Sequence, residues 1–280
     1  MEMCKRRLVK RPWSPSLGPA VSVGSAGPLP VGSLQASKSG RVLGWIGATL
    51  LIVLLVPFDG WLSRGAQALA LWLGRTLPLG GELQRELEVL QQYGGPASIA
   101  IGAATVWLLD PGARRRLLDW CAALGMTGIL VSAMKLIVGR ARPKFNDPLA
   151  FLGPFGTYQL GPHIGVRHAW EFWNGISSDL WSMPSSHTAY AVVMSVFLSS
   201  LYPRLRPLTI SLAALVGVCR VFLAAHYPSD VVAGAVLGYV VARRAIARCW
   251  GDRLLQWSWA RVGASRVDHG RDEPTLPRPV

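Results

Sequence analysis

Charged residues and cysteines are scarce in this chain of 280 residues. Only 16% of its residues are charged and 15 are acidic, whereas 51% are hydrophobic and the mean hydropathy is +0.32. A composition this apolar excludes an ordinary soluble globule of this size and predicts a membrane protein. The four cysteines lie far apart without a C-x-x-C pair, so neither a disulfide framework nor a zinc site is indicated.

Acidic residues are also outnumbered, because 29 lysines and arginines against 15 acids give a formal net charge of +14. In a soluble protein this excess would suggest a nucleic-acid partner. In a membrane protein it follows from the retention of Lys and Arg on the cytoplasmic side. The second explanation fits the hydropathy, so we expect no nucleic-acid partner.

Six apolar segments predict an all-α integral membrane protein, folded as a six-transmembrane-helix bundle. They form one domain over 41–250, with spans near 42–57, 97–110, 117–139, 187–202, 207–225 and 230–247. Between the first and second spans, Trp61 to Leu77 has leucines on one face and arginines near its ends, which is typical of an interfacial helix. Glu82 to Tyr93 predicts a second, short and polar helix.

The segments outside the spans are rich in polar residues, Pro and Gly. Residues 1–40 predict a basic, partly disordered cytoplasmic tail, and 251–280 predict a second cytoplasmic tail. The first apolar run begins only after Arg41, so we expect no cleavable signal peptide and a first span that remains as an anchor. The segment 144–183 predicts a large extramembrane loop, whose tryptophans either anchor it at the interface or hold a lipid substrate.

The distribution of basic residues predicts the orientation. With both termini in the cytoplasm, 20 of the 29 Lys and Arg lie on the inner side, seven lie outside and two lie within spans. This bias favours six spans over an odd number, and it predicts a bacterial-type inner (plasma) membrane protein with both ends inside.

Lys135 and Arg142 are the first group that could carry chemistry. They lie seven residues apart, two helical turns, so on a helix that runs to Pro143 both side chains point along one face. Charges at the membrane are costly, and each is a functional hypothesis. A lone Lys135 could equally extend to the interface without a function.

The second group is Pro184-Ser185-Ser186-His187, at the start of the fourth span. Serine at a helix start caps free N–H groups, and the same donors with the positive end of the helix dipole form an anion site. Ordinary capping explains the serines taken alone. His187 favours catalysis, because a histidine at an anion site can donate a proton to a leaving group.

The third group is Arg220, His226 and Asp230, at the end of the fifth span and the start of the sixth. Pro228 separates His226 from Asp230, so the pair straddles a turn. Asp230 can cap the sixth span and also reach one nitrogen of His226, which would hold the imidazole in one tautomer. Arg220 lies in an apolar helix, where a structural role without an anionic partner is hard to justify.

In the six-span arrangement all three groups lie on the same, outer side. Three cations, donors at a helix start and two histidines suit a phosphoryl group, whose transfer is catalysed mainly by positioning and charge stabilisation. No carboxylate cluster for a metal accompanies them, so we expect no metal and no other cofactor.

Together the three groups closely resemble the three-part signature of the type 2 phosphatidic acid phosphatase superfamily, which includes membrane lipid phosphate phosphatases and the soluble vanadium-dependent haloperoxidases. The resemblance implies that His226 is the nucleophile, that Asp230 orients it and that His187 protonates the leaving alcohol and then activates water. It also implies phosphate binding by five residues, Lys135, Arg142, Ser185, Ser186 and Arg220. Two residues depart from the pattern, since the family usually has Gly at Ser186 and Ser at Cys219.

The function that we expect is hydrolysis of a lipid phosphate or lipid pyrophosphate, through a phosphohistidine intermediate, at the outer (periplasmic) face. The partners implied are the lipid substrate and the bilayer. A lipid-to-lipid phosphotransferase is the nearest alternative, because a phosphohistidine can pass its group to an alcohol instead of water. A non-catalytic anion binder or transporter is disfavoured, because anion binding needs no proton relay by His187 and His226. The spans disfavour a haloperoxidase.

Overall fold

The computed structural model describes residues 38–76, 82–160, 165–171 and 177–257, so most of both predicted tails lies outside the described residues. The chain divides into two units, 1–51 and 52–280. The described part of the first unit belongs to helix α2 (Lys38–Leu55). Its large apolar side chains are exposed, Leu43 to 71% and Ile46 to 57%, which is typical of a helix that faces lipid.

The second unit is mainly helical. Its helices and strands, in chain order, are η1 (Val56–Phe58), α3 (Asp59–Thr76), α4 (Leu83–Leu90), η2 (Gln91–Gly94), α5 (Pro96–Leu109), η3 (Pro111–Ala113), α6 (Arg116–Val138), η4 (Pro143–Phe145), β1 (Thr157–Gln159), β2 (Val166–His168), η6 (Ser177–Leu180), α7 (Ser186–Leu201), η7 (Pro203–Leu205), α8 (Arg206–Phe222) and α9 (Pro228–Arg248). Each of the six predicted spans lies on a helix, and the two predicted intervening helices correspond to α3 and to α4 with η2.

Apolar helices long enough to cross a bilayer identify a membrane protein. Among the described residues, three helices meet this criterion by length and composition: Leu43–Thr76, Arg116–Val138 and Pro203–Phe222. Two more, Pro96–Leu109 and Ser186–Leu201, are apolar but shorter. The helical membrane class is therefore confirmed, and the count of six crossings stays a prediction.

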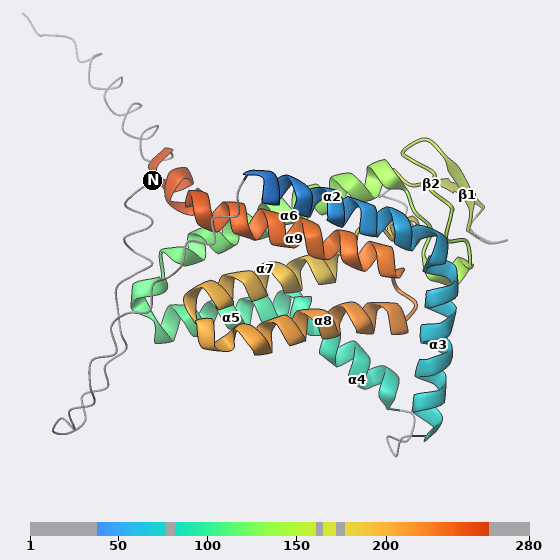
Figure 1. Ribbon diagram of the computed structural model, residues 1–280, viewed down its shortest axis with the longest axis horizontal. Helices are drawn as coiled ribbons and strands as arrows, with labels where there is room; N and C mark the ends of the chain where they lie inside the picture. Colours follow the sequence, from blue (N-terminus) through green and yellow to red (C-terminus); the bar gives the residue numbers. More distant parts are fainter. Residues whose placement is uncertain (1–37, 77–81, 161–164, 172–176, 258–280) are drawn as a thin grey trace, which may run out of the picture. The chain divides into compact units, whose positions relative to one another are not determined.

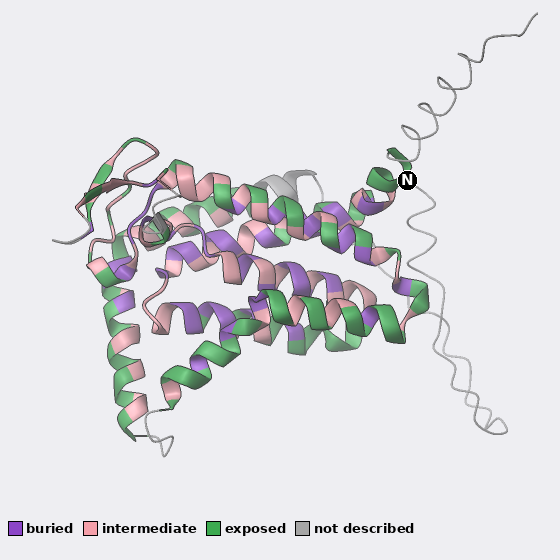
Figure 2. Ribbon diagram, turned by 180° about the vertical axis from the view of Figure 1, so that it is seen from behind, coloured by how far each residue is buried: buried purple, intermediate pink, exposed green. Residues whose placement is uncertain are grey.

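Helix α7 is the central element of the second unit. It packs against α6, α8 and α9, and none of its residues is exposed (Figures 1 and 2). The main core includes the stacked rings of Trp120 and Phe197, whose centroids are 4.8 Å apart. This packing holds the first turn of α7 against the first turn of α9, where two of the predicted groups lie.

Two glycines of α9 permit the close approach of α7. A methyl group on Gly234 would overlap the carbonyl oxygen of Ser185, and one on Gly238 would overlap that of Ala189. The two glycines are four residues apart and therefore lie on one face of α9. Backbone-to-backbone packing of this kind leaves no space for a side chain, so it fixes the spacing between the two helices.

One expectation requires correction, and the structure adds detail to others. Helix α6 ends at Val138, because Gly139 takes the left-handed conformation (φ 56°) that closes a helix, so Lys135 and Arg142 do not share a helical face. The 144–183 loop contains an antiparallel hairpin of β1 and β2. Among the described residues, Cys121 and Cys219 are free thiols.

The start of the predicted C-terminal tail is helical over 250–257. The backbone N–H of Gly251 donates to Asp119 Oδ1 at 2.9 Å, which ties this segment to the first turn of α6. The folded region therefore extends past the predicted boundary at 250.

Candidate active site

The chain around Arg142 is extended and turns back toward the core. Arg142 has φ −75° and ψ 159°, and its N–H donates to the carbonyl of Asp179 at 2.9 Å. Burial lowers the pKa of its guanidinium, against the raising effect of the Asp179 and Asp230 carboxylates. Lys135 remains on the last turn of α6 and is partly buried. The two cations thus reach the site from a helix and from a loop.

The first turn of α7 is capped as the sequence predicts. Ser185 is the N-cap, and its hydroxyl accepts a hydrogen bond from the N–H of Thr188 at 3.5 Å. Ser186 and His187 are the first two helical residues, so their N–H groups have no acceptor within the helix. Gly94 of η2 lies against the backbone of His187, where a methyl group would overlap the His187 carbonyl. The structure therefore presents free backbone donors next to His187, while the Ser185 hydroxyl itself is engaged in capping.

Arg220 is 8% exposed and has a neutral partner. Its Nη1 donates to Oε1 of Gln91, a residue of η2 that sequence reasoning did not identify. The Nε atoms of Arg220 and Arg142 are both buried without a hydrogen-bond partner among the described residues. Lys135, Arg142 and Arg220 all act electrostatically on His187. The structure thus brings the three predicted cations together around one histidine, with unsatisfied donors on two of them.

His226 is 1% exposed and lies in the connection between α8 and α9. Its Nδ1 is 2.6 Å from the backbone carbonyl oxygen of Ser182. Burial lowers the pKa of the imidazole to about 4, despite the raising effect of the Asp230 carboxylate. A neutral ring that donates from Nδ1 to a carbonyl leaves Nε2 with its lone pair free. The predicted tautomer is therefore the one that this geometry favours, although the partner of Nδ1 is Ser182.

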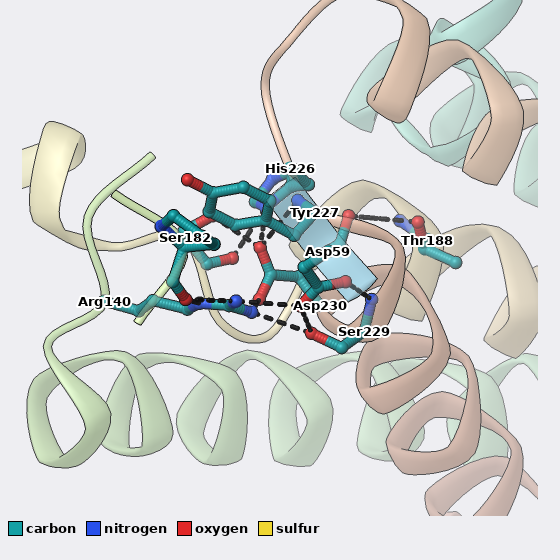
Figure 3. A network of polar contacts seen from close by, with 10 residues as sticks. Asp59, Arg140, Ser182, Thr188, His226, Tyr227, Ser229 and Asp230 are labelled. Atoms are coloured by element: carbon teal, nitrogen blue, oxygen red, sulfur yellow. Dashed lines mark hydrogen bonds and ion pairs between the residues drawn. The ribbon is translucent and has the colours of Figure 1, made fainter. Parts of the chain in front are cut away.

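Asp230 caps α9 as predicted, since its Oδ2 accepts from the N–H of Tyr227 at 2.9 Å. The expected hydrogen bond to His226 is not formed, because Oδ2 lies 3.8 Å from Nδ1. The carboxylate instead accepts from Ser182 Oγ at 2.5 Å and from Arg140 Nη1 at 2.7 Å (Figure 3). Asp230 therefore acts on the imidazole through its charge and through the residue that binds Nδ1.

Sequence reasoning missed Arg140 and Asp59, which are both fully buried behind Asp230. The two side chains form an ion pair of 2.7 Å (Figure 3). A signal was present for each of them. Arg140 lies between Lys135 and Arg142, and Asp59 is an acid directly after the first apolar run, where a charge is costly.

A cavity of about 400 Å³ opens beside the cations, between α6 and α7. Lys135 is its charged lining residue, and Ser186 and Trp181 also line it. The other lining residues are Gly128, Val131, Ser132, Leu136 and Tyr190. The indole N–H of Trp181 donates to the carbonyl of Ala169 at 2.7 Å, which fixes the ring in place. The cavity thus joins a cationic end to a mostly apolar wall.

The chemistry available to the site is that of cations and imidazoles. Within the part of the chain that the structure describes, no three His, Cys, Asp or Glu residues are grouped so that they could hold a metal ion. Lys135, Arg142 and Arg220 can bind an anion. The imidazoles of His187 and His226 can exchange protons with that anion or attack it as nucleophiles.

Comparison with known proteins gives a consistent family. Residues 116–253 match the family model described as the PAP2 superfamily. A lipid A 1-phosphatase of Rhizobium johnstonii is 34% identical over 113 residues, which are 40% of this chain and 39% of the relative. A lipid A 1-phosphatase of Rhizobium etli is also 34% identical over 113 residues, which are 40% of this chain and 41% of that relative. The chain spans about two fifths of the length of these curated relatives.

One solved structure is similar over a larger share of the chain. It is described as the first transmembrane PAP2 type phosphatidylglycerolphosphate phosphatase from Bacillus subtilis. The TM-score is 0.45 and the identity is 19%, covering 71% of this chain and 92% of that chain.

Proposed function

Residues 116–253 of the chain belong to the PAP2 superfamily, and on this premise we propose that the protein is a membrane phosphatase for a lipid phosphate or lipid pyrophosphate. The observation that carries the proposal is the pair of buried Nε atoms of Arg142 and Arg220, which have no hydrogen-bond partner among the described residues. A buried donor without an acceptor costs about 1–3 kcal/mol, and more when it is charged. A phosphoryl group between the two guanidinium groups would supply the missing acceptors, and charge-assisted bonds of this kind are among the strongest.

In the proposed reaction the Nε2 lone pair of His226 attacks phosphorus, and the bond between phosphorus and the lipid oxygen breaks. His187 gives its proton to that oxygen, so the lipid leaves as an alcohol or as a lipid with one phosphate fewer. His187 then takes a proton from water, whose oxygen attacks the phosphohistidine and releases inorganic phosphate. Lys135, Arg142, Arg220 and the free N–H groups of α7 stabilise the charge on the phosphoryl oxygens.

The nature of the substrate follows from the cavity. Its apolar wall adjoins Lys135 and Ser186, so a molecule that fills it needs a phosphate at one end and a hydrocarbon portion next to it. A lipid phosphate has this form, and it can enter sideways from the bilayer. Ser186 lines the same cavity as Lys135. Ser185 contributes through the helix start rather than through its hydroxyl, which Thr188 engages.

The positive-inside bias supports a site on the outer face. All three groups are reached from the same end of the helices, where α6 ends and where α7 and α9 begin. In a bacterial-type membrane with both termini in the cytoplasm, this end is periplasmic.

The test is release of inorganic phosphate by the purified protein from a panel of lipid monophosphates and pyrophosphates, with chelator present. We expect turnover in the wild type and none in His226→Ala, with the variant still folded and inserted. His168→Ala is the matched control, because this histidine lies on β2, where its ring nitrogen bonds to the backbone carbonyls of Phe155 and Gly156. Normal turnover in His226→Ala, or activity that chelator removes, would overturn the mechanism. Transfer of phosphate to a lipid alcohol without release would identify a phosphotransferase instead.

A further inference from the structure

We propose that Arg140 and Asp59 are positioning residues, which hold the two segments that carry and orient His226. This inference rests on the proposed function, since it assigns a role in the same reaction. Neither side chain faces the cavity beside Lys135, and both are completely buried. Their effect on the reaction must therefore pass through other residues, and the contacts show which ones.

All three nitrogens of the Arg140 guanidinium donate hydrogen bonds. Nη1 donates to Asp230 Oδ1 and to Ser229 Oγ, both at 2.7 Å. Nη2 donates to Asp59 Oδ2 at 2.7 Å and to the carbonyl of Pro148 at 2.6 Å, and Nε donates to the same carbonyl at 3.2 Å. The planar fork of an arginine permits this set of bonds, whereas a lysine offers one nitrogen.

Aromatic rings fix the plane of this guanidinium. Its Cζ lies 4.3 Å from the ring centroid of Tyr227 and 4.6 Å from that of Phe151. Contacts at this distance are favourable cation–π interactions. Because Tyr227 directly follows His226, the ring also links Arg140 to the backbone next to the imidazole.

Asp59 ties the start of α3 to the first turn of α9. Its Oδ1 accepts from the N–H of Ser229 at 3.0 Å, and its Oδ2 accepts from Ser229 Oγ and from Arg140. A carboxylate at a helix start binds the free N–H groups that have no partner within the helix. Asp59 therefore fixes Ser229, the residue before Asp230, together with Arg140.

The connection to His226 passes through Ser182. The backbone carbonyl of Arg140 accepts from the N–H of Ser182 at 3.0 Å, and the carbonyl of Ser182 lies 2.6 Å from His226 Nδ1. The hydroxyl of Ser182 donates to Asp230 Oδ2, whose other oxygen binds Arg140. Arg140 thus holds both the carbonyl that sets the tautomer and the carboxylate that lies 3.8 Å from the ring (Figure 3).

A purely stabilising role is the competing explanation. Buried ion pairs are weak contributors to stability, because the desolvation cost offsets the attraction. A positioning role makes a different prediction, since small displacements of a reacting group can reduce turnover by about 100-fold without weakening substrate binding. A fall in kcat without a change in KM therefore indicates a positioning role, and an unchanged kcat in the folded protein indicates a purely stabilising one.

The test compares Arg140→Lys and Asp59→Asn with Asp119→Asn. Asp119 is a matched control, because it is 2% exposed and pairs with Arg116 at 3.2 Å at the other end of α6. For the folded fraction of each protein we expect kcat to fall at least about 10-fold in the first two variants, with KM within about twofold. Asp119→Asn should unfold at a lower temperature with kcat unchanged.

A second measurement does not depend on turnover. Diethyl pyrocarbonate modifies accessible imidazoles, and mass spectrometry of the peptide that contains His226 gives the rate at that residue. We expect slow modification in the wild type and in Asp119→Asn, and faster modification in Arg140→Lys and Asp59→Asn. If Arg140→Lys does not fold, Ser229→Ala replaces it, because it removes the hydroxyl between Arg140 and Asp59 and leaves both charges in place.

Wild-type kcat and a wild-type modification rate in both site variants would overturn the inference, as would an equal loss of kcat in Asp119→Asn. If the wild type releases no phosphate from any lipid, the proposed function fails, and the modification rates still decide the positioning role.

Discussion

The backbone carbonyl oxygen of Ser182 lies 2.6 Å from Nδ1 of His226. The conformation of the segment before α7 therefore sets the proton position on the imidazole in the connection between α8 and α9. A carbonyl can only accept, so the neutral ring must carry its proton on Nδ1 and keep Nε2 free. Asp230, whose Oδ2 is 3.8 Å from Nδ1, is left to bind Ser182 and Arg140.

The buried state of His226 predicts loss of stability in acid. Burial lowers its pKa from 6.5 to about 4, so the unfolded chain takes up a proton at this residue before the folded protein does. The stabilising contribution of His226 is thus fully present above pH 6.5 and is lost as the pH falls toward 4. Unfolding temperatures at pH 7 and pH 5 should differ more in the wild type than in His226→Gln. Equal differences would contradict the assignment.

The same pKa predicts that the nucleophile remains neutral well below pH 6. As the pH falls through 6.5, the ordinary pKa of a histidine, protonation of His226 should therefore not lower the rate of phosphate release. Labelling with radioactive substrate at pH 5, followed by quenching in base, should still trap phosphate on His226. Absence of label at pH 5 with strong label at pH 7 would show that the imidazole is not held neutral.

The contact between α7 and α9 predicts strong sensitivity at Gly234. Alanine there overlaps the Ser185 carbonyl, so we expect Gly234→Ala to lower the free energy of unfolding by about 1–3 kcal/mol. Gly125→Ala is the control, because a methyl group at this α6 position meets nothing within 4 Å and should be neutral or stabilising. Chemical denaturation of both variants in detergent measures the difference. Equal stability of the two would contradict the close approach.

A side chain that fills the cavity should lower activity on lipid phosphates more than activity on water-soluble phosphates. Ser132→Phe places a ring in the cavity, so release from a long-chain lipid phosphate should fall at least about 10-fold, while release from a short, water-soluble phosphate monoester should persist. Ile129→Phe is the control, since Ile129 lies on α6, is 65% exposed and does not line the cavity. Equal loss on both substrates in Ser132→Phe would show that the cavity does not hold the hydrocarbon portion.

The orientation of the chain in the membrane can be tested with reporters in two loops. A reporter inserted at Gly165, where an added side chain meets nothing within 4 Å, should be active only outside the cytoplasm. A reporter at Arg204, between α7 and α8, should be active only inside. A cytoplasmic signal from Gly165 would place the site on the other face.

The helices and the predicted cations and histidines could be found from sequence because their signals are local. Apolar segments located α2, α5, α6, α7, α8 and α9, and Pro184-Ser185-Ser186-His187 located the start of α7. Pro143 predicts a helix that runs to Arg142, whereas Gly139 closes α6 earlier.

The supporting contacts could not be found in this way. Asp59 and Arg140 are 81 residues apart, and Gln91 and Arg220 are 129 apart, so only the packing of the helices brings each pair together. Likewise, the turn at Pro228 predicts Asp230 as the partner of His226, because Asp230 at the start of the next helix can reach the ring. The carbonyl of Ser182 carries no residue-specific signal, since every residue has one.

Arg140 bridges two carboxylates, and this affects the electrical state of the whole site. With Lys135, Arg142 and Arg220 it makes four cations against Asp59 and Asp230, while Lys144 and Asp179 neutralise each other at 2.7 Å. The surplus of two positive charges equals the charge of a phosphate dianion. The empty site therefore carries positive charge that a bound phosphate offsets, so inorganic phosphate should dissociate slowly and act as a product inhibitor.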